Sequence, residues 1–187
     1  GYPTGNSYLV TGSEKAILID LAVDDKDLQK YAGDLVDKQL QLVLTHGHID
    51  HTFHLDKFSD VWMNQEDEKF IREGMLGFPP ISPCPMIHYL KEGDTIDLGD
   101  RILDVFHVPG HSLGSLLFLD RKTRTLLAGD TCARRLLYGL TDYVPINDFI
   151  GSLRRLLTVE FDVIYTAHDR CPLPKVHIAN TIRYITE

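Results

Sequence analysis

The sequence is poor in cysteine, and this limits what could hold the fold together. It has three cysteines, Cys84, Cys132 and Cys171, and no two of them stand in a Cys-x-x-Cys spacing. Disulfide frameworks need paired cysteines, and structural zinc ribbons need close pairs of them. We therefore expect neither, and a reducing, cytoplasmic setting fits the cysteine content best.

Long apolar runs and an excess of positive charge are also missing. No apolar run approaches the ~20 residues that a membrane-spanning helix needs, and no basic start followed by an apolar stretch indicates a signal peptide. The formal net charge is −8, from 19 Lys and Arg against 27 Asp and Glu. Such a chain repels the phosphate backbone of nucleic acids. We expect neither a membrane nor a nucleic-acid partner, and a homodimer stays open.

What is present is an ordinary globular composition. The chain has 187 residues, of which 43% are hydrophobic and 25% are charged. This length suffices to bury one sizeable core. We therefore expect a single domain over residues 1–187.

Apolar patterns in the first half predict two helices among short strands. Strands are expected at Ser7–Val10, Ala16–Asp20, Leu40–Thr45 and Val61–Asn64, the first two as a hairpin. Asp24 or Asp25 is expected to cap a helix. The apolar face of that helix is predicted to comprise Leu28, Tyr31, Ala32, Leu35 and Val36. A second helix is expected from the acidic residues 65–68 to near Gly74.

The second half is predicted to be a β meander followed by helix, strand and helix. Before it, Gly74–Pro85 holds two Gly and four Pro, which favours an irregular, mobile loop. Strands are expected at Ile87–Leu90, Thr95–Leu98, Arg101–His107, Ser115–Asp120, Thr125–Ala128 and Val163–Ala167, and helices at Asp148–Thr158 and Val176–Ile185. This order predicts two sheets, or one folded sheet, flanked by helices.

The segment Thr45-His46-Gly47-His48-Ile49-Asp50-His51 carries the clearest chemistry, at the end of an apolar strand. Zinc-class cations bind neutral imidazole nitrogen and carboxylate oxygen, and a catalytic site keeps an open position for water. His46 and His48 converge on one ion if the chain turns, and a tight loop directs Asp50 and His51 at a second. A polar surface loop or an expression tag is the alternative, but the run is internal, interrupted and preceded by a strand.

This segment resembles the signature of the metallo-β-lactamase superfamily. Three later segments resemble the other motifs of that family in the expected order: Val108–Ser112, Ala128–Thr131 and Tyr165–His168. The resemblance covers roughly residues 6–170 and implies an α/β (α+β) fold, the four-layer αββα sandwich that holds one or two metals at the edges of its sheets. The Gly-Gly that commonly follows the first motif is replaced here by Phe53-His54.

Carried over residue by residue, the resemblance implies seven metal ligands. His46, His48 and His111 would hold the first ion, and Asp50, His51 and His168 the second. Asp130 would bridge the two ions. The expected cofactors are two divalent ions, zinc first, with iron or manganese as alternatives because His and carboxylate suit all three metals.

The implied activity is that of a metallo-hydrolase similar to glyoxalase II. A metal-bridged hydroxide would cleave an ester, thioester or lactone bond in a small molecule, with Asp50 as a catalytic residue that orients the nucleophile. An alternative is an oxidoreductase similar to persulfide dioxygenases, with one iron held by His46, His111 and Asp130. β-Lactamase or phosphodiesterase activity and a non-enzymatic metal-binding role also stay open.

Substrate recognition is expected from loops over the metals. The candidates are Gly74–Pro85, with Met75 and Phe78, and residues 134–143. Within the latter, Arg134 or Arg135 could meet a substrate carboxylate, and Tyr138 and Tyr143 could donate to an oxyanion or simply pack. Cys132 could be structural or line the site. The four remaining histidines, His54, His88, His107 and His177, are expected to be exposed or packing residues.

Overall fold

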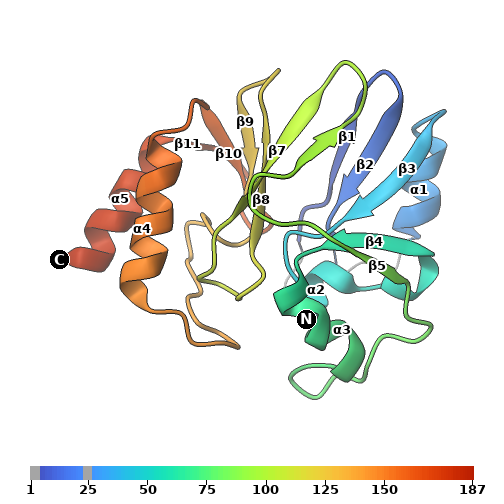
Figure 1. Ribbon diagram of the computed structural model, residues 1–187, viewed down its shortest axis with the longest axis horizontal. Helices are drawn as coiled ribbons and strands as arrows, with labels where there is room; N and C mark the ends of the chain where they lie inside the picture. The colour runs from blue at the N-terminus through green and yellow to red at the C-terminus, as the bar shows by residue number, and fades with distance from the viewer. Residues whose placement is uncertain (1–4, 23–26) are drawn as a thin grey trace.

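The computed structural model describes residues 5–22 and 27–187, and these form two β-sheets that face each other with helices on both outer sides (Figure 1). The strand order is β1-β2-β3-β4-β5 in the first sheet and β11-β10-β9-β8-β7-β6 in the second. This is the αββα sandwich that the sequence motifs imply.

The first sheet begins with a hairpin and continues in parallel. β1 (Tyr8–Thr11) pairs antiparallel with β2 (Lys15–Ile19), as expected from the sequence. β3 (Gln39–Val43), β4 (Asp60–Met63) and β5 (Met86–Tyr89) then add in parallel. The connections carry α1 (Leu28–Asp34), α2 (Ile49–Thr52) and α3 (Glu68–Glu73), with 3-10 turns at Leu55–Lys57 and Gln65–Asp67.

The second sheet is an antiparallel meander extended by two strands from the C-terminal part. The meander runs through β6 (Thr95–Asp97), β7 (Ile102–His107), β8 (Leu116–Asp120) and β9 (Thr125–Leu127). β10 (Val163–Tyr165) joins β9 in parallel, and the short β11 (Leu173–Pro174) pairs antiparallel with β10. The helices α4 (Ile146–Leu157) and α5 (Val176–Thr186) cover the outer face of this sheet (Figure 1).

Three hydrophobic clusters correspond to the three interfaces between the four layers. Successive side chains of β2 point to opposite faces of the sheet and so belong to two different clusters. Ile17 and Ile19 pack between the sheets, whereas Leu18 packs outward with Ala32 of α1. The third cluster joins Phe149 of α4 and Ile178 of α5 to the second sheet. Burial on both faces explains why inner strands such as β2 and β8 are rich in Leu and Ile.

The sequence prediction was wrong about β5 and about the face of α1. β5 was expected in the meander but pairs with β4, since α3 and the loop Gly74–Pro85 form a crossover long enough for a parallel return. Tyr31 of α1 and Leu35, which caps its C-terminus, are 62% and 59% exposed, so Ala32 is the buried residue of the helix. Asp27 caps this helix by accepting from the Lys30 amide, whereas Asp24 and Asp25 lie outside the described residues.

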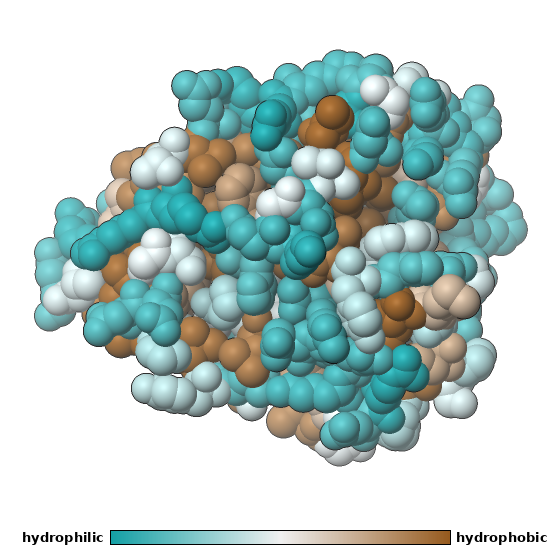
Figure 2. Space-filling model, in the orientation of Figure 1, coloured by the Kyte–Doolittle hydropathy of each residue, from teal (hydrophilic) through white to brown (hydrophobic). Residues whose placement is uncertain are grey.

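The loop Gly74–Pro85 has neither helix nor strand over its described length, as predicted. Hydrophilic side chains cover most of the face shown in Figure 2, with hydrophobic residues visible between them. No helix in the described part of the chain combines the length and the apolarity that a membrane crossing requires.

Candidate metal centre

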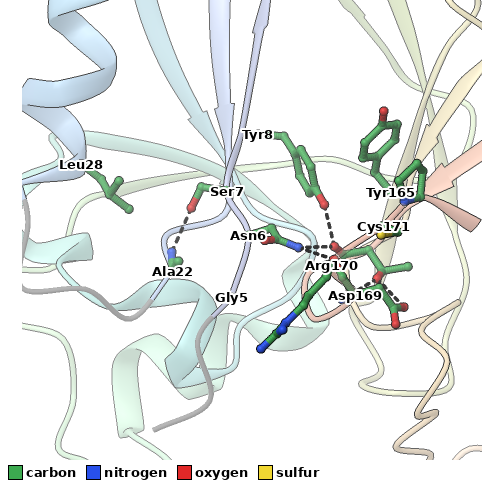
Figure 3. A pocket seen from close by; sticks show the side chains of 12 residues that line it. Gly5, Asn6, Ser7, Tyr8, Ala22, Leu28, Tyr165, Asp169, Arg170 and Cys171 are labelled. Atoms are coloured by element: carbon green, nitrogen blue, oxygen red, sulfur yellow. Dashed lines mark hydrogen bonds between the residues drawn. The ribbon is translucent and has the colours of Figure 1, made fainter.

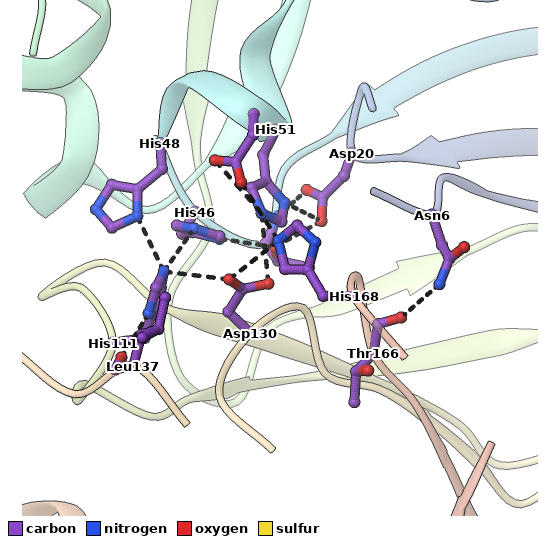
Figure 4. Close-up of polar contacts among 12 residues, drawn as sticks. Asn6, Asp20, His46, His48, His51, His111, Asp130, Leu137, Thr166 and His168 are labelled. Carbon is purple, nitrogen blue, oxygen red and sulfur yellow. Dashed lines mark hydrogen bonds and ion pairs between the residues drawn. The ribbon is translucent and has the colours of Figure 1, made fainter. Parts of the chain in front are cut away.

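Four strand ends, those of β3, β7, β9 and β10, deliver the seven predicted ligands to one edge of the sandwich. His46 and His48 follow β3, Asp50 and His51 lie in α2, His111 lies between β7 and β8, and Asp130 and His168 follow β9 and β10 (Figure 4). The ligand atoms of three groups each lie within 4.8 Å of one another: His46, His48 and His111; His46, His51 and Asp130; and Asp50, His51 and His168. The structure therefore brings all seven side chains together.

The first triad, His46, His48 and His111, consists of buried imidazoles whose nitrogens converge. Nε2 of His111 lies 2.9 Å from Nδ1 of His48 and 3.1 Å from Nε2 of His46. Burial, reinforced by the neighbouring histidines, lowers the pKa of His48 to about 3 and also lowers the pKa of His46 and of His111. All three rings are thus held neutral, which is the form that binds a metal ion.

The second triad, Asp50, His51 and His168, contains a carboxylate and is more open. The Asp50 side chain is 19% exposed and that of His168 is 25% exposed, and Oδ2 of Asp50 lies 3.3 Å from Nε2 of His168. Hydrogen bonds to Asp130 and Asp50 raise the pKa of His168 to about 10. Burial acts to lower the pKa of His51, but Asp20 and Asp130 hold it well above the usual value. Positive charge is therefore favoured at this triad.

Asp130 lies between the two triads and faces both. Its Oδ1 lies 3.4 Å from Nε2 of His51, and its Oδ2 lies 3.5 Å from Nε2 of His111 and 3.3 Å from Nε2 of His168. Burial opposes ionisation, but His168 and His51 hold the pKa of Asp130 far below its usual range. A charged carboxylate at this position suits a ligand shared by two ions.

Two buried atoms of the site lack the partner that a metal would supply. Nε2 of His51 and Oδ1 of Asp130 are among the few side-chain atoms in residues 5–22 and 27–187 that are buried without a hydrogen bond. Buried polar groups left unpaired are costly and rare. Because both atoms belong to predicted ligands and face the same space, the residues present fit a bound cation, and nitrogen and carboxylate donors suit zinc, iron or manganese.

Polar partners fix the outward-facing atoms of the ligand rings. Asp20 accepts from Nδ1 of His51 at 2.9 Å and from the backbone amide of Thr45 at 2.7 Å. The Leu137 carbonyl lies 2.7 Å from Nδ1 of His111, and Oγ1 of Thr141 lies 3.1 Å from Nε2 of His48. Such contacts select the ring atom that is left to face the metal. Sequence reasoning missed Asp20 and Thr141, although Asp20 is the last residue of a predicted strand.

Asp67 connects the two loops that carry the first triad. Its carboxylate is fully buried, and it accepts from the backbone amides of Gly47 and Gly114 at 3.0 and 2.8 Å and from Oγ of Ser112 at 2.7 Å. A Cβ on Gly114 would lie 2.5 Å from Cγ of Asp67, so only glycine lets the backbone approach so closely. This residue was also missed by sequence reasoning.

The N-terminal segment holds the loop that presents His168. The side-chain amide of Asn6 donates to the carbonyls of Thr166 and Asp169, and the hydroxyl of Tyr8 donates to the Thr166 carbonyl at 2.6 Å (Figure 3). These bonds join the first sheet to the end of β10 in the second. The relative position of the two sheets is thereby fixed close to the metal centre.

The predicted substrate-binding residues lie on the loop that follows Asp130. The exposed Arg134 has its Nε 3.6 Å from Oδ1 of Asp169. Tyr138 packs its ring on Phe149 and donates its hydroxyl to the Val144 carbonyl, whereas Tyr143 is 86% exposed. Their roles in binding stay predictions.

Other residues singled out in the sequence have structural surroundings. Cys132 is buried in the cluster beneath α4, and burial raises the pKa of its thiol to about 12. His88 pairs with Asp60 at 2.9 Å and stacks on Trp62. His107 donates from Nε2 to the Leu113 carbonyl at 2.7 Å. These contacts agree with packing roles for the three residues.

Comparisons with known proteins agree with this geometry. The acyl-coenzyme A thioesterase MBLAC2 of Gallus gallus is 30% identical to the chain and aligns over 83% of the chain and 69% of its own length. The hydroxyacylglutathione hydrolase GloC of Haemophilus influenzae is 28% identical, with 87% of the chain and 84% of the relative covered.

The solved structure of TTHA1623 in a di-iron-bound form matches with a TM-score of 0.80 and 25% identity, covering 97% of the chain and 95% of that structure. The sequence model of the metallo-beta-lactamase superfamily matches residues 2–168 of the chain. This range contains all seven converging side chains. Fold, ligand order and this match agree, and the chain belongs to the metallo-β-lactamase superfamily.

Proposed function

We propose that the chain is a dinuclear metal-dependent hydrolase that cleaves thioester bonds in small molecules. The observation that carries the proposal is the convergence of seven ligand side chains in three overlapping groups, each within 4.8 Å. Family membership supports the reaction class, and relatives named as thioesterase and hydroxyacylglutathione hydrolase support the bond type.

In this proposal the first triad would hold one ion, the second triad would hold the other, and Asp130 would be shared between them. Divalent ions bound there would lower the pKa of a bound water toward neutrality and polarise the substrate carbonyl. Asp50, whose side chain is 19% exposed and so borders the open side of the centre, would orient the attacking water. Zinc is the proposed metal, and the di-iron form of TTHA1623 makes iron the first alternative to test.

The side chains next to the centre favour water as the nucleophile. Ser112 follows His111, but its hydroxyl donates to Asp67 at 2.7 Å and is buried. Cys132 is 2% exposed and packs in a hydrophobic cluster. A serine or cysteine nucleophile must reach the substrate and needs a base beside it. Neither residue meets that requirement.

We also propose that residues 1–187 act as one domain. The hydrophobic cluster between the sheets contains side chains from both, such as Ile19 of β2 and Phe118 of β8. The metal centre likewise draws ligands from both sheets. Each half would therefore lack a complete site alone.

The test is metal analysis combined with a substrate panel. Protein purified without added metal is analysed for its ions, and then assayed with thioesters, lactones, β-lactams and phosphodiesters in zinc, manganese and iron. The proposal predicts two ions per chain and the highest kcat/KM with thioesters. One iron per chain with oxygen uptake on a persulfide, and no thioester hydrolysis, would replace it with the oxidoreductase alternative.

A further inference from the structure

A cavity of about 680 Å³ lies between the loop that follows Asp130 and the C-terminal helix α5. The loop contributes residues 133–136, and α5 contributes residues from His177 onward. The volume is typical of small-molecule sites. None of the seven metal ligands lines this cavity, so it is a separate feature of the molecule.

The cavity is lined by three arginines in a chain whose net charge is −8. They are Arg134, Arg135 and Arg183, and the acidic residue that lines the cavity with them is Glu187. Within the described residues, Arg135 and Arg183 form no ion pair, and Arg134 is 3.6 Å from Asp169. Planar guanidinium groups match phosphate oxygens in two-bond contacts and stay charged at any physiological pH. Such a lining suits an anion with several phosphate oxygens.

The wall formed by α5 is elongated and polar. His177, Asn180, Thr181 and Tyr184 line the cavity and recur at the spacing of one helix face, over a length of about 10 Å. Nε2 of His177 is buried without a hydrogen bond. Tyr184 is 87% exposed, so its ring offers a face on which a nucleobase can stack. The wall thus suits a nucleotide rather than a compact carboxylate.

The cavity is close to the metal centre along the chain. Four peptide units separate Asp130 from Arg134, so their Cα atoms are at most about 15 Å apart. The Arg134 amide also donates to Oδ2 of Asp169, the residue after the ligand His168, at 3.0 Å. One end of the cavity is therefore connected, through Arg134, to the ends of β9 and β10, which supply the ligands Asp130 and His168.

We propose that this arginine cavity binds the phosphorylated nucleotide end of a coenzyme A thioester whose acyl bond lies at the metal centre. The inference rests on the proposed thioester hydrolysis and names its substrate class. The arm between the sulfur and the first phosphate of coenzyme A is about as long as four peptide residues, roughly 14 Å when extended.

The binding test uses adenosine 3′,5′-bisphosphate, which carries the nucleotide but no thioester. Its binding to the metal-loaded protein is measured by calorimetry for the wild type, for the double variant Arg135→Gln/Arg183→Gln and for the control Arg154→Gln. Arg154 is exposed on α4 and does not line the cavity. We expect the double variant to bind at least about tenfold more weakly, which corresponds to about 1.4 kcal/mol, and the control to bind as the wild type does.

A kinetic comparison separates this inference from the proposed function. Butyryl-coenzyme A and S-butyryl-pantetheine share the scissile bond, but only the first carries the nucleotide. We expect the double variant to raise KM for butyryl-coenzyme A about tenfold with little change in kcat. Equal KM values for the two substrates in the wild type, or no binding of the bisphosphate, would overturn the inference about the cavity. Hydrolysis of both substrates would still uphold the proposed function. Hydrolysis of neither thioester would overturn both.

Discussion

The two ligand triads lie side by side but are built differently. The first triad has three buried imidazoles whose partners are the hydroxyls of Thr45 and Thr141, the Leu137 carbonyl and one another. The second triad has a carboxylate of its own and a second carboxylate, Asp20, behind His51. Burial thus favours neutral rings in the first triad, and carboxylates favour a cation in the second. The same residue type, histidine, is given two electrostatic environments within one site.

Asp130 is the residue on which both triads depend, and its replacement should have the largest effect. Asp130→Asn keeps the shape but removes the charge that faces His51, His111 and His168. We expect the loss of at least one bound ion and a fall in kcat/KM of about 10³-fold. Metal analysis and steady-state kinetics check this. The control is Asp162→Asn, which removes an exposed carboxylate paired with Arg124. A variant that keeps both ions and full activity would contradict the bridging role.

Asp67 contacts the two loops that carry the first triad, so its replacement tests how strongly the carboxylate holds those loops together. In the Asp67→Asn variant, the backbone amides of Gly47 and Gly114 and the hydroxyl of Ser112 still donate toward position 67. The asparagine side chain has only one acceptor oxygen, and its NH2 group is itself a donor. We expect the free energy of unfolding of the metal-free protein to fall by about 3 kcal/mol. Denaturant unfolding measures this. An unchanged midpoint and slope would show that the carboxylate does not hold the two loops.

Asp20 and Thr141 provide a matched pair, because each contacts the outward-facing nitrogen of one ligand ring. Asp20→Asn removes the charged partner of His51, and Thr141→Val removes the neutral hydroxyl partner of His48. We expect Asp20→Asn to lower the affinity for one of the two ions by about 10- to 100-fold. Thr141→Val should lower the affinity for the other ion only a few-fold. Metal titration of each variant measures both affinities. Equal effects on both ions would remove the distinction between the triads.

The ligand set could be predicted from the sequence, because a compact motif carries much of it. His46, His48, Asp50 and His51 lie within six residues, and the remaining ligands follow predicted strands in the order that the family resemblance implies. The alternation of apolar and polar residues also predicted most strands correctly. It could not assign β5 to a sheet, since a strand of four residues looks alike at either position.

The supporting residues could not be predicted, since each is a single polar residue without a local pattern. Asp67 resembles any acidic residue at the start of a helix, and only the fold brings it to Gly114, 47 residues away in the chain. Thr141 belongs to the segment expected near the substrate, but nothing in the sequence distinguishes it there, whereas the aromatic hydroxyls of Tyr138 and Tyr143 stand out. Tyr138 instead packs on Phe149, a contact made only when α4 folds onto the second sheet.

The most direct test of the central claim is a titration of the metal-free protein with zinc, monitored by calorimetry and followed by metal analysis. We expect two ions per chain in the wild type, with Asp20→Asn weakening one of the two binding steps and leaving the other intact. A single ion per chain in the wild type, unaffected by Asp20→Asn, would contradict this expectation.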